Sequence, residues 1–252
     1  PAELVFGHNN FLWPCQGIAP PEGAFLHLYA VDLARTPDGR WWVTADRTQA
    51  PSGAGYALEN RTVMNRVFPS LFRDSHVHRL SLFFSRLRQR LHELNPNGGI
   101  ARIVVLTPGI YNEAYFEHAY LANYLGFQLV QGSDLSVRNG YVWMKALDGL
   151  KRVDVILRRV DDIYCDPVEL KGDSRLGVPG LLEVARLGHV AIANPLGSSV
   201  LENPALLRYL PAIAQALLGR DLQMPSVKTW WCGNSDDLDY VCKNLKELLI
   251  SV

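Results

Sequence analysis

The 252-residue chain carries 25 basic and 25 acidic residues, which gives a formal net charge of +0. General nucleic-acid binders and anionic-membrane binders usually carry a basic excess, so this balance argues against both partners. Hydrophobic residues make up 48% of the chain and charged residues 20%, which is typical of a folded globular protein. The length suits one large domain or two small ones.

The sequence shows neither a targeting signal nor a pair of cysteines at metal-binding spacing. No apolar run approaches the ~20 residues of a membrane span. The start, "PAELVFGHNNFLWP", does not have the basic and then apolar order of an export signal. The four cysteines have no C-x-x-C spacing, so we expect reduced thiols rather than disulfides or a zinc site. The sequence therefore predicts a soluble, cytoplasmic protein.

The first third of the chain is predicted to be β-rich and to contain a hairpin. Apolar residues at 24–34 and 40–46 flank "RTPDGR", in which Gly39 suits the left-handed position after a type I turn. If the loop is 37–39, Asp32 pairs with Thr44, and Asp46 lies on the same face as Asp32. Diagonal neighbours of this kind are roughly 7–8 Å apart. The two carboxylates would then form a cation or polar-ligand site; the alternative is that both are solvated on an exposed face.

The chain from 74 to 225 is predicted to be α/β. Apolar residues recur at three and four positions from Leu80 to Leu94, which predicts a helix. "RIVVLTPG", "NEAYFEHAYLANYL" and "FQLVQG" then give a strand, a helix and a strand, which imply a parallel sheet. Further strands are expected at "VDVILRRVDD" and "HVAIANPLG", with helices at "GVPGLLEVARLG" and "NPALLRYLPAIAQALLG".

Polar side chains follow several of these predicted strands. Thr107, Arg158 with Arg159, and Asn194 each come at the end of an apolar strand. Open α/β sheets bind ligands at the carboxyl ends of their strands. Arg158 or Arg159 is therefore a candidate clamp for a carboxylate or phosphate. The alternative is that these arginines pair with the nearby aspartates as a structural network.

The turn "APSGAGY" at 50–56 is a candidate binding loop. Ser52, Gly53 and Gly55 are small, so their backbone N–H groups can approach an oxygen and form an anion nest. The turn lacks the lysine of a P-loop and does not fit G-x-G-x-x-G. Its alternative interpretation is a tight turn with close packing.

Four segments together resemble one family. They are "LHLYAVDLARTPDGRWWVTADRTQAPSGAGYALENR", "LTPGIYNEAYFEHAYLANYLGFQLVQGSDL", "VDVILRRVDDIYCDPVELKGDSRLGVPGLLEVARLG" and "KTWWCG". They look like the bacterial circularly permuted ATP-grasp proteins of type 2, in the group associated with alpha-E and transglutaminase-like partners. The likeness covers nearly all of residues 8–245, in order. The family is related in fold to glutathione and glutathionylspermidine synthetases.

The resemblance implies a fold, a chemistry and ligands. It implies a parallel-sheet, pre-ATP-grasp-like domain at 74–225, between the N-terminal part of a β-rich ATP-grasp domain at 1–73 and its incomplete continuation at 226–252. It also implies ATP-dependent carboxylate–amine ligation, with Mg²⁺ at the phosphates. Asp32 and Asp46 would hold the metal, and Arg158 would orient a carboxylate or phosphate. Ser52, Gly53, Gly55 and Asn194 would line the cofactor site.

The chain also departs from the pattern of catalytically complete relatives, which resembles Glu-Asp-Asn-x-Arg-x-Pro-Ser-Gly. Ala45, Arg47 and Gln49 replace its Glu, Asn and Arg, and Pro204 stands where relatives have a nucleotide-contacting Lys. The C-terminal ATP-grasp subdomain is expected to be missing. Three hypotheses follow: a ligase module for peptide-like or polyamine-like substrates, a non-catalytic module that needs a partner chain or the missing subdomain, and a nucleotide-independent small-molecule binder.

Overall fold

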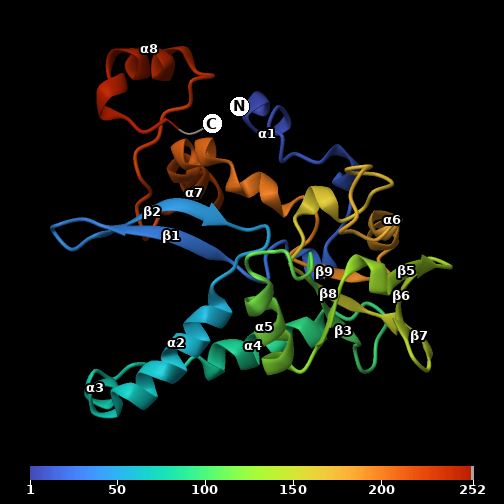
Figure 1. Cartoon of the computed structure of the whole chain (residues 1–252). Coiled ribbons are helices and arrows are strands. Elements are labelled where there is room, and N and C mark those ends of the chain that lie inside the picture. The colour runs from blue at the N-terminus through green and yellow to red at the C-terminus, as the bar shows by residue number, and fades with distance from the viewer. Residues whose placement is uncertain (251–252) are drawn as a thin grey trace. The chain divides into compact units, whose positions relative to one another are not determined.

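The chain divides into two compact units that interleave along the sequence. The computed structural model describes residues 1–250 (Figure 1). The first unit, which we call the hairpin unit, contains residues 1–12, 29–48 and the chain from 197 onward. The second, which we call the sheet unit, contains residues 13–28 and 49–196. This division differs from the predicted boundaries at 73 and 225, because each unit is assembled from segments that are far apart in sequence.

A four-stranded parallel sheet forms the centre of the sheet unit. Its strand order is β4-β3-β8-β9, and every neighbouring pair is parallel. The bounds are β3 Ile103–Leu106, β4 Gln128–Val130, β8 Val155–Arg158 and β9 Ala191–Ala193. The predicted α/β fold with a parallel sheet is therefore confirmed. All four strands are short and largely apolar, as expected when both faces of a sheet are covered.

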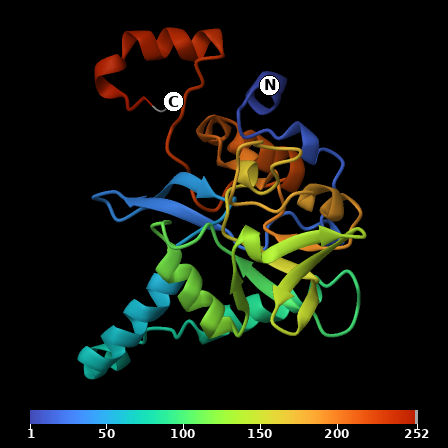
Figure 2. The ribbon, with the colours of Figure 1, turned by 45° about the vertical axis from the view of Figure 1, so that its right-hand side comes forward.

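Alternation along the strands divides the apolar core between the two faces of this sheet. On β3, Val104 and Leu106 join one core cluster, whereas Ile103 and Val105 join the other. The first cluster includes residues of α6 (Leu181–Arg186) and the second includes residues of α4 and α5. Figures 1 and 2 show the sheet between these layers.

Four predicted helices are present. In the sheet unit they are α4 (Ser81–Glu93), α5 (Tyr115–Leu125) and α6, and in the hairpin unit α7 (Leu210–Leu218). Gly126, with φ 75°, ends α5 in the left-handed conformation that terminates many helices. The 3₁₀ turn at Pro204–Arg208 precedes α7, so the predicted helix from 203 is divided in two.

The expectation that the first third is β-rich was wrong. Only β1 (Ala30–Arg35) and β2 (Trp41–Arg47) are strands there. Helices α2 (Ala54–Val67) and α3 (Pro69–Asp74) follow the glycine-rich turn. Helix α2 buries only Gly55 and Leu58, so its sequence lacks a wide apolar stripe that would indicate a helix.

A three-stranded antiparallel meander was not predicted from the sequence. It consists of β5 (Leu135–Arg138), β6 (Tyr141–Ala146) and β7 (Gly149–Val153). Asn139 and Gly140 connect β5 to β6. Both have a positive φ, which is the usual backbone conformation of a two-residue hairpin turn. The meander contributes Leu135, Val142 and Val153 to the core cluster that contains α6.

The hairpin unit is built around the antiparallel pair β1–β2. Val43 of β2 donates its N–H to the carbonyl of Pro225 and accepts from the N–H of Val227, so residues 225–227 join the outer side of β2. Helices α1 (Ala2–Phe6), α7 and α8 (Ser235–Lys243) belong to the same unit. Among residues 1–250, no helix is long and apolar enough to cross a membrane.

Candidate functional site

The carboxyl edge of the parallel sheet gathers polar residues, as the sequence predicts. Each of its four strands is followed directly by a polar residue at this edge. The backbone there is fixed by two hydrogen bonds, from Thr107 N–H to the Val130 carbonyl at 2.9 Å and from Arg159 N–H to the Leu106 carbonyl at 2.8 Å. The four residues are Thr107, Gln131, Arg159 and Asn194.

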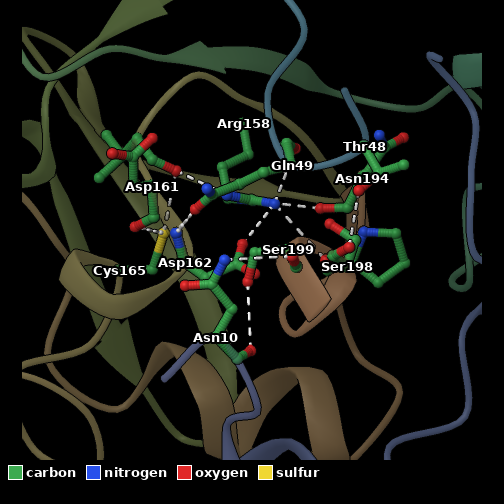
Figure 3. A network of polar contacts seen from close by, with 12 residues as sticks. Asn10, Thr48, Gln49, Arg158, Asp161, Asp162, Cys165, Asn194, Ser198 and Ser199 are labelled. Carbon is green, nitrogen blue, oxygen red and sulfur yellow. Dashed lines mark hydrogen bonds and ion pairs between the residues drawn. The ribbon is translucent and has the colours of Figure 1, made fainter. Parts of the chain in front are cut away.

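Arg158 is the predicted catalytic residue, and that role stays a prediction; in this fold its side chain has several internal partners. Its guanidinium donates to the carbonyl oxygens of Gln49 (2.9 Å), Val160 (2.8 Å) and Asn194 (3.1 Å). It also forms an ion pair with Asp162, with 2.5 Å between Nη2 and Oδ1. Figure 3 shows Gln49, Asp162 and Asn194 around the arginine. Because the side chain is completely buried, its charge is used to connect the loops that follow the strands.

The predicted cofactor contact of Asn194 stays a prediction, and in this fold its side chain also binds a neighbouring segment. Its side-chain oxygen accepts from the N–H groups of His27 (2.8 Å) and Leu28 (3.0 Å). Its side-chain nitrogen donates to the Leu28 carbonyl at 2.7 Å. The amide therefore holds the segment at 27–28 in the way that a neighbouring β-strand would.

The glycine-rich turn forms the predicted anion nest, but its anion is a side chain of the protein. The N–H groups of Gly53 and Gly55 both donate to Oε1 of Glu117, at 2.7 and 2.9 Å. Gly53 has a φ of 109°, a conformation that glycine adopts easily and in which the N–H groups of Gly53 and Gly55 can point at the same oxygen. Glu117 lies in the first turn of α5 and is 1% exposed.

The close approach of the Glu117 side chain explains why this turn has a glycine at position 55. A Cβ atom on Gly55 would lie 2.7 Å from Cγ of Glu117, so any larger residue would displace the carboxylate. Ser52 is exposed beside the nest. The predicted contacts of Ser52, Gly53 and Gly55 with a cofactor stay predictions, and the two glycine N–H groups are already used by Glu117.

Arg159 differs from Arg158 in having no hydrogen-bonding partner for its side chain in residues 1–250. It is 5% exposed, and its Nε is buried without an acceptor. Burial lowers the pKa of Arg159 to about 10, and the nearby carboxylate of Glu117 opposes this shift. Oε2 of Glu117 is likewise buried without a hydrogen bond.

His118 lies in the same surroundings and is held neutral. Its Nδ1 is 2.9 Å from the hydroxyl of Thr107, and that hydroxyl also accepts from Gly109 N–H at 3.2 Å. Burial lowers the pKa of His118 to about 4, and the positive charge of Arg159 adds to the effect. Above that pH the imidazole of His118 therefore adds no positive charge beside Arg159.

The predicted pairing of the two hairpin carboxylates was wrong. The turn pairs Thr36 with Arg40 as expected, but a bulge between Asp32 and Leu33 shifts the register, so Asp32 pairs with Ala45 and Asp46 with Val31. A shift of one residue moves side chains to the other face, so Asp32 and Asp46 lie on opposite faces. Metal binding by these residues stays a prediction.

Both carboxylates have partners within the hairpin unit. Asp32 forms an ion pair with Arg47 at 2.5 Å, and Asp46 accepts from the hydroxyl of Tyr29 at 2.5 Å. In residues 1–250, no group of three or more His, Cys, Asp or Glu side chains is arranged to hold a metal ion. Magnesium prefers several oxygen ligands, and each of these two carboxylates already has a partner within the unit.

The residues that depart from the resembled pattern have structural partners. Arg47 neutralises Asp32, and the side-chain oxygen of Gln49 accepts from Asp162 N–H at 2.6 Å. Pro204 opens the 3₁₀ turn after Asn203, whose side chain caps it by accepting from Ala205 N–H. Arg47, Gln49 and Pro204 therefore serve the fold of their own units, and the structure gives no comparable role for Ala45 among residues 1–250.

Sequence reasoning missed the internal role of Glu117. A usable signal was present, because Glu117 is followed four and eight residues later by Leu121 and Leu125, all on one buried face of α5. A carboxylate on an apolar helix face needs a donor, and the glycine-rich turn had N–H groups to offer. Arg159 was predicted only as one of two possible clamps.

The chain matches the sequence model of a family described as circularly permuted ATP-grasp type 2, over residues 1–252. It is 44% identical over 253 residues to an uncharacterized protein of Mycobacterium tuberculosis, and the match covers 99% of this chain and 28% of that protein. It is 42% identical over 251 residues to an uncharacterized protein of Synechocystis, which covers 99% of this chain and 52% of that protein. The chain thus spans about half the length of these curated relatives, or less.

Proposed function

Because the chain belongs to the circularly permuted ATP-grasp type 2 family, we propose that it is the substrate-holding part of an ATP-dependent carboxylate–amine ligase. In this proposal ATP and Mg²⁺ are bound mainly by residues outside this 252-residue chain. The small substrate is peptide-like or polyamine-like. The longer relatives are consistent with this proposal, since at most 52% of either protein corresponds to this chain.

The observation that carries the proposal is the occupation of the anion nest by Glu117. A nest that served nucleotide phosphates would need its N–H groups free, whereas Gly53 and Gly55 donate to the carboxylate. A phosphate brought there would also meet a like charge. The pairing of Asp32 with Arg47 supports the same conclusion for magnesium.

Calorimetric titration with ATP and magnesium tests this proposal. The 252-residue chain is expected to show no micromolar binding, with any Kd near or above ~1 mM. A longer family protein that contains the corresponding segment is expected to bind ATP more tightly. Micromolar binding by the 252-residue chain, abolished by Asp46→Ala, would contradict the proposal and support a complete nucleotide site in this chain.

A second candidate is a non-catalytic module that binds a partner protein, such as an alpha-E or transglutaminase-like protein. It is favoured by the ion pair of Asp32 with Arg47 and the hydrogen bond from Tyr29 to Asp46, because both carboxylates then contribute to the fold of the hairpin. A longer family protein that neither binds nor hydrolyses ATP would favour this candidate.

A further inference from the structure

The surroundings of Arg159 contain two opposite charges, each with a buried polar atom that has no hydrogen bond in residues 1–250. Within residues 1–250 no hydrogen bond or ion pair engages the Arg159 side chain, although only 5% of the residue is exposed. Glu117 uses one carboxylate oxygen for the nest and leaves Oε2 buried without a hydrogen bond. Such groups are costly to bury, and native structures usually give them a partner.

Alternation along β8 explains why only one of the two arginines is left in this state. Arg158 follows Ile156 on the face that carries the α6 core cluster, where Asp162 neutralises it. Arg159 is one position further on and lies on the face of Leu157, which packs in the cluster with α4 and α5. Its N–H donates to the Leu106 carbonyl at 2.8 Å, and the hydroxyl of the following Thr107 is 2.9 Å from Nδ1 of His118, so Arg159 lies near the first turn of α5.

These groups define the chemistry of a ligand. A guanidinium is a planar fork of donors that matches a carboxylate. The free oxygen of Glu117 only accepts, so it needs an N–H group from the ligand. A phosphate would satisfy the arginine but would be repelled by Glu117, whereas a carboxylate with an adjacent N–H satisfies both.

We propose that Arg159 and Glu117 bind the main-chain group of an amino acid or of a peptide C-terminus, with the carboxylate on Arg159 and the α-nitrogen donating to Glu117. The inference rests on the proposed function, in which this unit holds the substrate. Thr107 and His118 are the neutral neighbours of the two charges. The loop from β3 to α5, which begins at Thr107, also carries the exposed residues Ile110 and Tyr111.

The stability of the ligand-free chain gives a first test. If Arg159 gains a hydrogen-bonding partner only when a ligand binds, Arg159→Met removes a buried charge that has no hydrogen bond or ion pair in the ligand-free chain. The melting temperature is then expected to rise by about 2 °C or more. Arg158→Met is the matched structural control, and its melting temperature is expected to fall by about 5 °C or more because Asp162 loses its partner. A fall or no change in Arg159→Met would assign it a structural role and overturn the inference.

Ligand protection gives the second test, measured without nucleotide. L-alanine and L-alanyl-L-alanine are expected to raise the melting temperature of the unaltered chain, and which of them acts more strongly separates a free amino acid from a peptide terminus. Arg159→Met is expected to weaken the binding at least about tenfold. Glu117→Gln keeps an oxygen for the nest but loses the second acceptor, so it is expected to weaken binding by a similar factor.

Three results would contradict the site. They are no protection by either probe, equal protection by acetate or inorganic phosphate, and unchanged protection in Arg159→Met. Arg138→Met, on the exposed end of β5, should leave both readouts unchanged. Because these probes contain no nucleotide, the site and the ATP titration can fail independently.

Discussion

Adjacent residues of the same type have different roles in this protein. Arg158 is surrounded by carbonyl oxygens and Asp162, whereas Arg159 has no such partner in residues 1–250. The side chains of consecutive strand residues point to opposite faces, so one step along the chain changes the whole environment. The same rule separates Asp32 from Asp46 once the bulge has shifted the register.

His118 makes the stability of the protein depend on pH. Its pKa is lowered from 6.5 to about 4 in the folded protein, first by burial and then by Arg159. Protonation therefore favours the unfolded state. Its contribution is complete above pH 6.5 and is lost as the pH falls from 6.5 towards 4. At about pH 5 we expect a loss of about 2 kcal/mol of unfolding free energy from this group.

Urea denaturation of the chain and of His118→Gln, at about pH 7.5 and about pH 5, checks this expectation. The variant should lose less stability on acidification than the unaltered chain. His27 also has a lowered pKa, caused by burial and by Arg90, so part of the pH dependence should persist. His78→Gln, at an exposed position, serves as the control. Identical pH dependence in the chain and His118→Gln would contradict the assignment.

At the scale of elements, single carboxylates organise irregular segments. The chain between β8 and α6 contains little regular structure, and Asp166 is completely buried within it. Its Oδ1 accepts from the N–H groups of Val168 (2.9 Å) and Gly180 (3.1 Å), and its Oδ2 from Leu182 N–H (2.9 Å). Asp166 therefore fixes both the start of α6 and the loop that precedes it.

We expect Asp166→Ala to lower the unfolding free energy by about 3 kcal/mol or more, because three backbone donors lose a charged acceptor. The midpoint of urea denaturation measures the change. Asp173→Ala is the matched control, since Asp173 is exposed in the same segment, and its effect should stay within about 0.5 kcal/mol. A loss below about 1 kcal/mol for Asp166→Ala would show that water replaces the carboxylate.

The elements that were predicted correctly share one property: their own side chains decide their type. Helix α4 has its buried residues Phe84, Leu87 and Leu91 at helical spacing, and β3 is a short, wholly apolar run. Helix α2 was missed because it buries little and depends on the preceding turn. The bulge in the hairpin was missed because register depends on both strands and their neighbours.

At the scale of the whole molecule, the four cysteines differ in how far solvent and reagents can reach their thiols. Cys165 is completely buried, and Cys15 lies against the core cluster of the sheet unit. Burial raises the pKa of both thiols to about 12. Cys232 and Cys242 are exposed, in the hairpin unit.

Native-state labelling with a thiol reagent at about pH 8 should therefore modify two cysteines quickly, and all four only after unfolding. The reagent reacts with thiolate, which Cys15 and Cys165 form only rarely at that pH. Mass spectrometry of peptides identifies the modified positions. The double variant Cys232→Ser and Cys242→Ser should show almost no fast labelling. Fast modification of Cys165 in the folded chain would contradict the closed core of the sheet unit.

The sequence by itself determined the α/β class, the parallel order of β3 and β4, and the polar residues at the carboxyl edge. These features depend on hydrophobic periodicity and on strand ends, which can be read from residues that are consecutive in the chain. It also offered an anion nest at 51–55, with a tight, closely packed turn as the alternative. Only the tertiary structure decided that Glu117 fills this nest and that Arg159, rather than Arg158, has a side chain without a hydrogen-bonding partner in residues 1–250. Those outcomes depend on which buried charges meet, and burial and pairing are properties of segments brought together by folding.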